Sequence, residues 1–165
     1  MNTDLNFNQI IDNSLKNEGE YVNNPSDKGA ETKFGISKRS YPELNIKNLT
    51  LEQAKAIYKR DFWDNQPYKN IENISIAGRV FDMSINMGTR QAAILLQRAL
   101  RACGNKDIID DGIIGLATLN AANITSIKLL TVALKSESAG FYRSLVASNP
   151  KQIVFFKGWL NRAYA

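Results

Sequence analysis

Apolar residues recur at helical spacing along most of the chain, and this pattern predicts a mainly α-helical protein. Phe7, Ile10, Ile11 and Leu15 lie three or four positions apart, which predicts an amphipathic helix over about 4–17. Thr50 and Gln53 have the spacing of a capping box ahead of a second helix. The same reasoning predicts further helices, so that the full set covers about 4–17, 51–63, 75–87, 90–102, 115–122, 126–147 and 150–163.

Polar and glycine-rich segments separate these helices. Residues 19–36 are rich in Gly, Asn and Asp, and they predict an irregular loop with at most a short β-hairpin. Residues 37–41 are expected to form one helical turn, and 104–115 a loop. Thr89 is expected to cap the helix that follows it, and Asn149 and Pro150 to begin the last one. We therefore expect one compact, mainly α domain.

The chain has no histidine, and this excludes several classes of enzyme. Ser-His-Asp and Cys-His machinery and imidazole-ligated zinc sites cannot be built, and the single cysteine, Cys103, cannot form an intrachain disulfide. Acid–base work would fall to Asp, Glu, Lys or Tyr, and no metal or cofactor is expected. Ser148 and Lys151 have the spacing of a serine–lysine pair, but Asn149 and Pro150 between them indicate a helix start instead.

The net charge of +5, from 21 basic and 16 acidic residues, favours an anionic partner or simple solubility. The basic residues are scattered, which argues against nucleic-acid binding. The first twenty residues have no basic start followed by an apolar stretch, so no signal peptide and no stable membrane insertion are expected.

Two carboxylates near the N-terminus are candidates for catalysis. Glu18 ends the first predicted helix, where the helix dipole and partial burial would keep it protonated. Asp27 follows in a polar loop and should stay ionised. Such a pair supplies the acid and the base or stabiliser of glycoside hydrolysis. From spacing alone, a solvated surface glutamate and a turn-forming aspartate are the more common interpretations.

The surrounding residues resemble a known family. The run Glu18-Gly19-Glu20-Tyr21, then Asp27, Gly29, Thr32, Phe34, Gly35 and Ile36, resembles glycoside hydrolase family 108, whose members are N-acetylmuramidases, many from phages and prophages. The resemblance continues in order through the segments Phe62–Asp64, Phe81-Asp82, Asn86–Gly88, Leu96–Leu100, Asp111–Gly115 and Gly158–Arg162. Three loop positions depart from the family pattern: Glu20, Lys28 and Ala30.

The resemblance implies a lysozyme-like helical fold and a set of site residues. Its implied catalytic residues are Glu18, Asp27 and Thr32, and its implied substrate contacts are Tyr21, Trp63, Asp82 and Asn86. Trp63 also suits core packing, and Asp82 and Asn86 also suit a local pair on one helix face. The implied regions are a hydrolase region over 1–91 and a predicted peptidoglycan-binding region over 92–165, packed into the same globule. The turn at Asp111-Gly112 is either structural or part of a wall-binding surface.

The expected activity is cleavage of the β-1,4 bond between N-acetylmuramic acid and N-acetylglucosamine in peptidoglycan, as in a phage endolysin. A lytic transglycosylase and a non-catalytic wall-binding or secretion-assisting protein are the alternatives. The expected partner is the glycan strand, the expected state a monomer. The protein is expected to be made in the cytoplasm and to act on the wall after export or holin-type release.

Overall fold

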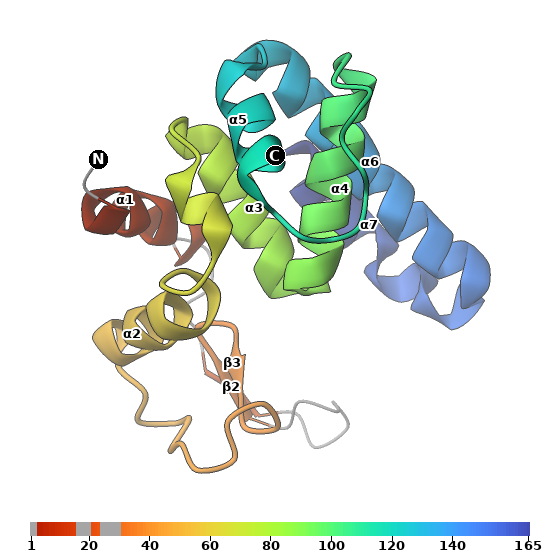
Figure 1. Ribbon diagram of the computed structural model, residues 1–165. Helices are drawn as coiled ribbons and strands as arrows, with labels where there is room; N and C mark the ends of the chain where they lie inside the picture. Colours follow the sequence, from red (N-terminus) through yellow and green to blue (C-terminus); the bar gives the residue numbers. More distant parts are fainter. Residues whose placement is uncertain (1–2, 16–20, 24–30) are drawn as a thin grey trace. The chain divides into compact units, whose positions relative to one another are not determined.

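The computed structural model describes residues 3–15, 21–23 and 31–165. Within them the chain is mainly helical, which confirms the expected fold class (Figure 1). The helices are α1 (Thr3–Leu15), α2 (Leu51–Phe62), α3 (Ile74–Met87), α4 (Thr89–Ala102), α5 (Leu116–Ile124), α6 (Ile127–Ser148) and α7 (Ile153–Tyr164), with the 3₁₀ turns η1 (Pro67–Asn70) and η2 (Pro150–Gln152).

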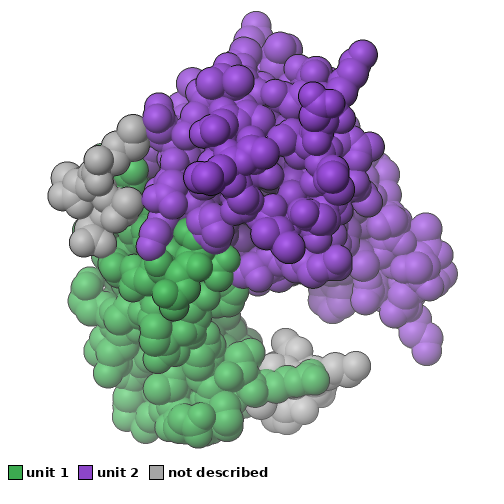
Figure 2. Space-filling view, in the orientation of Figure 1, with its two compact units in different colours: residues 1–66 green, residues 67–165 purple. Residues whose placement is uncertain are grey.

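Two compact units make up the chain, residues 1–66 and 67–165 (Figure 2). The division falls before η1, whereas the sequence analysis placed its boundary at 91/92. A compact unit is defined by contacts and a functional region by its chemistry, so the 91/92 boundary stays a prediction.

In the first unit, α1 and α2 supply the core. Phe7 and Ile11 of α1 are buried, and the ring of Phe7 lies 5.9 Å from that of the buried Trp63. Lys55 of α2 forms an ion pair of 2.9 Å with Asp12 of α1. The capping box at the start of α2 is confirmed, since Gln53 N–H donates to the Thr50 hydroxyl and the Gln53 side chain accepts from Thr50 N–H.

A small antiparallel sheet, in the order β1-β2-β3, lies between these helices in the sequence; its strands are β1 (Val22–Asn23), β2 (Glu31–Lys33) and β3 (Ile36–Ser37). Phe34 and Gly35 connect β2 to β3, and both have positive φ, 51° and 73°. That combination is typical of a tight two-residue hairpin turn. The short hairpin allowed by the sequence is therefore present, with a third strand added.

One local expectation was right and another was wrong. Residues 37–41 form a single turn after β3, in which the Ser37 carbonyl accepts from Ser40 and Tyr41 N–H, and the bond from Tyr41 has the i to i+4 spacing of one helical turn. Thr89 does not cap α4, because it is already the first helical residue. Gly88, with φ of 88°, is both the C-cap of α3 and the N-cap of α4. Because glycine has no side chain, α4 begins without a side-chain cap.

In the second unit, α3, α4 and α6 pack against one another, α7 packs against α6, and α5 packs against α4. The central helices bury apolar side chains such as Val80, Phe81, Leu96 and Leu134. Tyr142 of α6 stacks on Trp159 of α7 with ring centroids 5.2 Å apart. Pro150 begins η2 rather than α7, and Asn149 makes no side-chain capping bond there.

None of the described helices is by itself long and apolar enough to cross a membrane. Only α5 and α6 taken together pass that test, and the pair is bent by 119°.

Candidate functional site

The candidate catalytic segment lies in the first unit, between α1 and β2 in the sequence. Glu18 and Asp27 lie outside the described residues. Glu18 comes three positions after Leu15, the last residue of α1, and Asp27 comes four positions before Glu31, the first residue of β2. The sequence expectations for both carboxylates therefore stay predictions.

Thr32 lies on β2, and Tyr21 immediately precedes β1. Thr32 is the central residue of β2, is partly exposed, and has Val22 of β1 and Ser37 of β3 as its strand partners. Asn23 is paired with Glu31 across the same strands. The antiparallel pairing thus places Asn23 opposite Glu31, and these two residues flank the Asp27 segment in the sequence. Thr32 is the residue that follows Glu31.

Glu31 is a residue that the sequence analysis did not single out. The Glu31 side chain lies close enough to the Tyr21 hydroxyl to influence its ionisation. Partial desolvation raises the pKa of Tyr21, and the negative charge of Glu31 raises that pKa further. Tyr21 therefore remains a neutral phenol near neutral pH. Only the register of β1 against β2 brings Glu31 near Tyr21. A strand of two residues is too short for its register to be recognised from the sequence.

The hairpin next to these residues is held by α2. The Tyr58 hydroxyl donates to the Phe34 carbonyl at 2.9 Å, and Tyr58 is only 5% exposed. A non-glycine residue at positive φ is unfavourable unless its surroundings stabilise it. The contact between α2 and the turn supplies such support, and it ties β2, which carries Thr32, to the core of the first unit.

A second polar pair in the first unit joins the segment after β3 to α2. The Tyr41 hydroxyl donates to Asp61 Oδ2 at 2.7 Å. Burial, followed by the hydrogen bond to Asp61, raises the pKa of Tyr41 to about 12. Arg60, bonded to the same carboxylate, is the largest influence that lowers the pKa of Asp61. Asp61 is thus an ionised structural carboxylate and a poor proton donor near neutral pH.

Trp63 lies in the core of the first unit. It is 1% exposed and packs against Phe7, which is the core-packing interpretation of this residue. A sugar platform needs an open ring face, and the ring is covered in this structure. The assignment of Trp63 as a substrate contact stays a prediction, and the burial of its ring does not support it.

Asp82 and Asn86 lie on α3, in the second unit. Asn86 is exposed, and its side-chain amide donates to the Asp82 carbonyl at 2.7 Å and, at 3.4 Å, to the Asp82 carboxylate. Asp82 also forms an ion pair of 2.8 Å with Arg162 of α7. Asp82 therefore anchors α7 to α3, while Asn86 leaves part of its amide available to a ligand.

The turn at Asp111-Gly112 is a structural feature organised by one buried side chain. Gln97 of α4, 1% exposed, donates to Asp111 Oδ1 at 2.8 Å and to the Ile113 carbonyl at 2.9 Å, and it accepts from Gly112 N–H at 2.9 Å. The hydrogen bond from Gln97 is the main cause of the lowered pKa of Asp111. Within the described part of the chain, no group of three His, Cys, Asp or Glu side chains is arranged to hold a metal ion.

Comparison with known families gives two consecutive matches. Residues 11–88 match the model described as Glycosyl hydrolase 108, a range that includes Glu18, Asp27 and Thr32. Residues 91–164 match the model described as Predicted Peptidoglycan domain.

The solved structure of Brucella abortus SagA is similar in fold. It superposes with a TM-score of 0.75 at 23% sequence identity, over 97% of this chain and 90% of that chain. At this identity the likeness establishes a shared fold. No curated protein sequence matches the chain. The two consecutive matches identify a glycosyl hydrolase 108 region over residues 11–88 and a peptidoglycan domain over residues 91–164, so the chain is a glycoside hydrolase that acts on peptidoglycan.

Proposed function

We propose that the protein is an N-acetylmuramidase that cleaves the β-1,4 bond between N-acetylmuramic acid and N-acetylglucosamine. The observation that carries the proposal is the match of residues 11–88 to glycosyl hydrolase 108, because this range contains both candidate carboxylates. With no histidine in the chain, carboxyl groups are the natural acid and base for glycosidic cleavage near neutral pH.

In this proposal Glu18 is the general acid. It protonates the oxygen of the leaving sugar, while positive charge develops on the ring that keeps the anomeric carbon. Asp27, ionised, either stabilises that charge or activates the water that attacks the anomeric carbon. Thr32, whose hydroxyl lies on the strand that follows the Asp27 segment, positions the water, and Tyr21 contacts the sugar through its neutral phenol.

The second unit contributes to substrate binding in the same proposal. Asn86, exposed on α3, contacts a sugar through the part of its amide that Asp82 does not use. Asp82 positions Asn86 and also holds α7 through Arg162. Functionally, residues 1–91 act as the hydrolase region and residues 92–165 as the peptidoglycan-binding region of a monomer.

We place the activity in cell lysis of the endolysin type, with the protein made in the cytoplasm and reaching the wall through export or holin-type release. The net charge of +5 favours association with an anionic wall. Expression in a Gram-negative host, with and without a co-expressed holin, tests the route: lysis only with the holin supports release, and lysis without it supports self-sufficient export.

Product analysis tests the bond that is cleaved. Purified peptidoglycan is digested to completion, the soluble fragments are reduced with borohydride, and their masses are measured by mass spectrometry. Reduced muramic acid at the new ends is the expected result. Reduced glucosamine ends would indicate cleavage of the other glycosidic bond, and 1,6-anhydromuramic ends, which resist reduction, would indicate a lytic transglycosylase. Either of these would overturn the proposal.

A further inference from the structure

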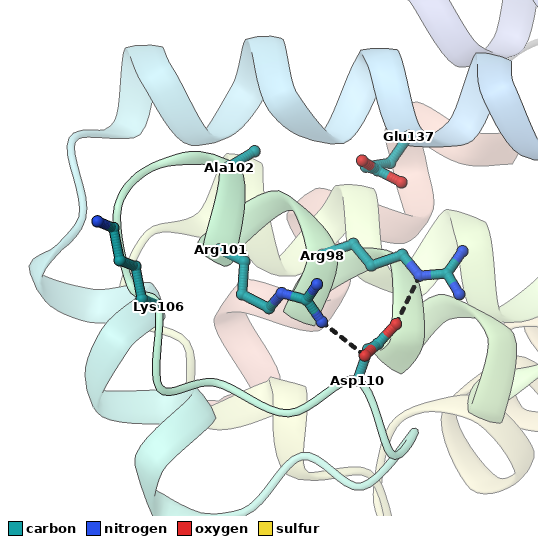
Figure 3. A pocket seen from close by; sticks show the side chains of 6 residues that line it. All are labelled: Arg98, Arg101, Ala102, Lys106, Asp110 and Glu137. Atoms are coloured by element: carbon teal, nitrogen blue, oxygen red, sulfur yellow. Dashed lines mark hydrogen bonds and ion pairs between the residues drawn. The ribbon is translucent and has the colours of Figure 1, made fainter.

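A charged pocket of about 630 Å³ lies in the second unit, and none of the residues assigned above to hydrolysis is among those that line it. It is lined by Arg98, Arg101 and Ala102 of α4, Lys106 and Asp110 of the loop between α4 and α5, and Glu137 of α6 (Figure 3). Three of these side chains are cationic and two are anionic.

The loop that forms one wall of the pocket is held at three points. Buried Gln97 binds the loop around Asp111. The Asn105 side-chain amide donates to the Leu100 carbonyl and to the Thr125 hydroxyl, both at 3.0 Å. Asp110 accepts from Arg98 Nε at 2.8 Å and from Arg101 Nη1 at 2.7 Å. Lys106 therefore extends from a loop whose position is set before any ligand arrives.

Arg98 and Arg101 each have N–H groups that are not used in binding Asp110. Arg98 and Arg101 are one turn apart on the exposed face of α4, and each uses one nitrogen on Asp110. A guanidinium has five N–H donors, so most of them remain free for a second carboxylate. Among the described residues, neither Lys106 nor Glu137 forms an ion pair, and Figure 3 shows the Glu137 carboxylate on α6 facing the side of α4 that carries the arginines.

The charges indicate which part of peptidoglycan fits. All six lining residues fall within residues 91–164, the range that matches the peptidoglycan domain model. The glycan strand is uncharged where the lactyl group of muramic acid is joined to the peptide. Sugar sites usually offer aromatic faces, yet the described residues that line this pocket include no aromatic one. The stem peptide, in contrast, carries free carboxylates and, at its diamino acid, a free ammonium group.

We propose that this pocket binds the stem peptide of peptidoglycan. A peptide carboxylate lies against Arg98, Arg101 and Lys106, and the ammonium group of the diamino acid lies against Glu137. The pocket then holds the wall by its peptide while the glycan strand is cut elsewhere. This extends the proposed function, since it takes peptidoglycan as the substrate but does not depend on which glycosidic bond breaks.

The test titrates the full chain with a synthetic peptide, L-Ala–γ-D-Glu–meso-diaminopimelate, and measures the dissociation constant by calorimetry at low ionic strength. The peptide has no glycosidic bond, so the result is independent of hydrolysis. Lys106→Gln is expected to weaken binding about three- to fivefold, the range of a partly exposed charge pair. Lys128→Gln is the matched control, because Lys128 is an exposed lysine of α6 that does not line the pocket and the variant changes the net charge equally.

A second arm identifies the ammonium contact. Glu137→Gln is expected to weaken binding of the tripeptide by a similar factor, and to leave unchanged the binding of a tripeptide whose diaminopimelate amine is acetylated. Glu72→Gln, at an exposed glutamate outside the pocket, is the matched control and should bind both peptides as the wild type does.

Several outcomes would overturn the proposal. The wild type would show no saturable binding of the tripeptide, Lys106→Gln and Lys128→Gln would weaken it equally, or Glu137→Gln would affect both peptides alike. Binding of inorganic phosphate with the same dependence on Lys106, together with no binding of the tripeptide, would assign the pocket to a phosphate-bearing polymer instead.

Discussion

The hydroxyl of Tyr58 donates a 2.9 Å hydrogen bond to the carbonyl of Phe34, the non-glycine residue with positive φ in the β2–β3 turn. Helix α2 thereby stabilises a backbone conformation that side chains disfavour, and the turn holds Thr32 on β2 next to β3. The bond connects the core of the first unit to the turn that follows β2, the strand that carries Thr32.

Removal of this bond should cost stability. Tyr58→Phe keeps the buried ring and deletes the hydroxyl, so we expect the free energy of unfolding to fall by about 1 kcal/mol. Urea denaturation of the full chain measures the change. An unchanged midpoint would show that the turn does not need α2. If the bond also maintains the site, the rate of peptidoglycan digestion by Tyr58→Phe should fall while the protein remains folded.

Gly112 should tolerate no side chain. Its φ is 81°, and a Cβ there would lie 2.7 Å from Cγ of Arg90 and 3.3 Å from the Arg90 carbonyl oxygen. Gly112→Ala is expected to lower the free energy of unfolding by about 1–2 kcal/mol from the backbone alone, with the close contact adding to this.

The control for Gly112 is Gly140, in the middle of α6. A Cβ at Gly140 meets nothing within 4 Å, and alanine is the better helix former. Gly140→Ala is therefore expected to raise stability by about 0.5–1 kcal/mol. Equal effects of the two substitutions in thermal melts would contradict the turn geometry at Gly112.

The Asp110 ion pairs predict an acid-sensitive contribution to stability. The hydrogen bond from Arg98 is the largest cause of the lowered pKa of Asp110. A carboxylate with a lowered folded pKa stabilises the protein above its ordinary pKa of about 3.9, and this contribution is lost as pH falls through the folded value. Asp110→Asn should therefore be less stable than the wild type at pH 7, and the difference should shrink toward pH 2.

Urea midpoints across pH 2–7 check this prediction. Asp107→Asn is the control, since Asp107 is exposed on the same loop and has no ion pair among the described residues. Because the Asp110 pairs are partly exposed, added salt should also reduce the difference at pH 7. A difference between Asp110→Asn and wild type that persists unchanged at low pH would mean that packing, and not charge, is its source.

Asn86 offers a test of substrate contact on α3. Asn86→Ala removes an exposed side chain whose hydrogen bonds, among the described residues, go to Asp82 of the same helix. Stability should hold or rise slightly, because alanine favours a helix. We expect kcat/KM on soluble glycan oligomers to fall about tenfold, the value of one lost hydrogen bond to substrate. An unchanged kcat/KM would show that Asn86 only pairs with Asp82 on α3 and does not contact the substrate.

The long helices could be predicted because their signals are local. The Thr50–Gln53 capping box and the apolar spacing of Phe7, Ile10 and Ile11 lie within a few residues, and the structure confirms both. The β2–β3 turn is weaker in sequence because Phe34, and not a typical turn residue, adopts positive φ, supported by a contact 24 residues away.

Only part of the candidate site could be predicted, again because some of its contacts join residues that are distant in the sequence. Tyr21 and Thr32 were named from a resemblance, while Glu31 was missed because its relation to Tyr21 depends on strand register. The charged pocket was invisible in sequence because α4, the following loop and α6 each supply only part of it. Glu18 and Asp27 lie outside the described residues, so chemistry must test them.

The most direct test of the account is the rate at which the full-length Glu18→Gln protein releases reducing muramic ends from purified peptidoglycan. The substitution keeps the size of the side chain and removes the proton that the leaving sugar needs. The expected rate is at least about a hundredfold below that of wild type, with an unchanged circular dichroism spectrum and melting temperature. Glu20→Gln, two positions away, is the matched control and should retain most of the rate. A folded Glu18→Gln protein that digests peptidoglycan at the wild-type rate, or loss of the rate in Glu20→Gln instead, would contradict the account.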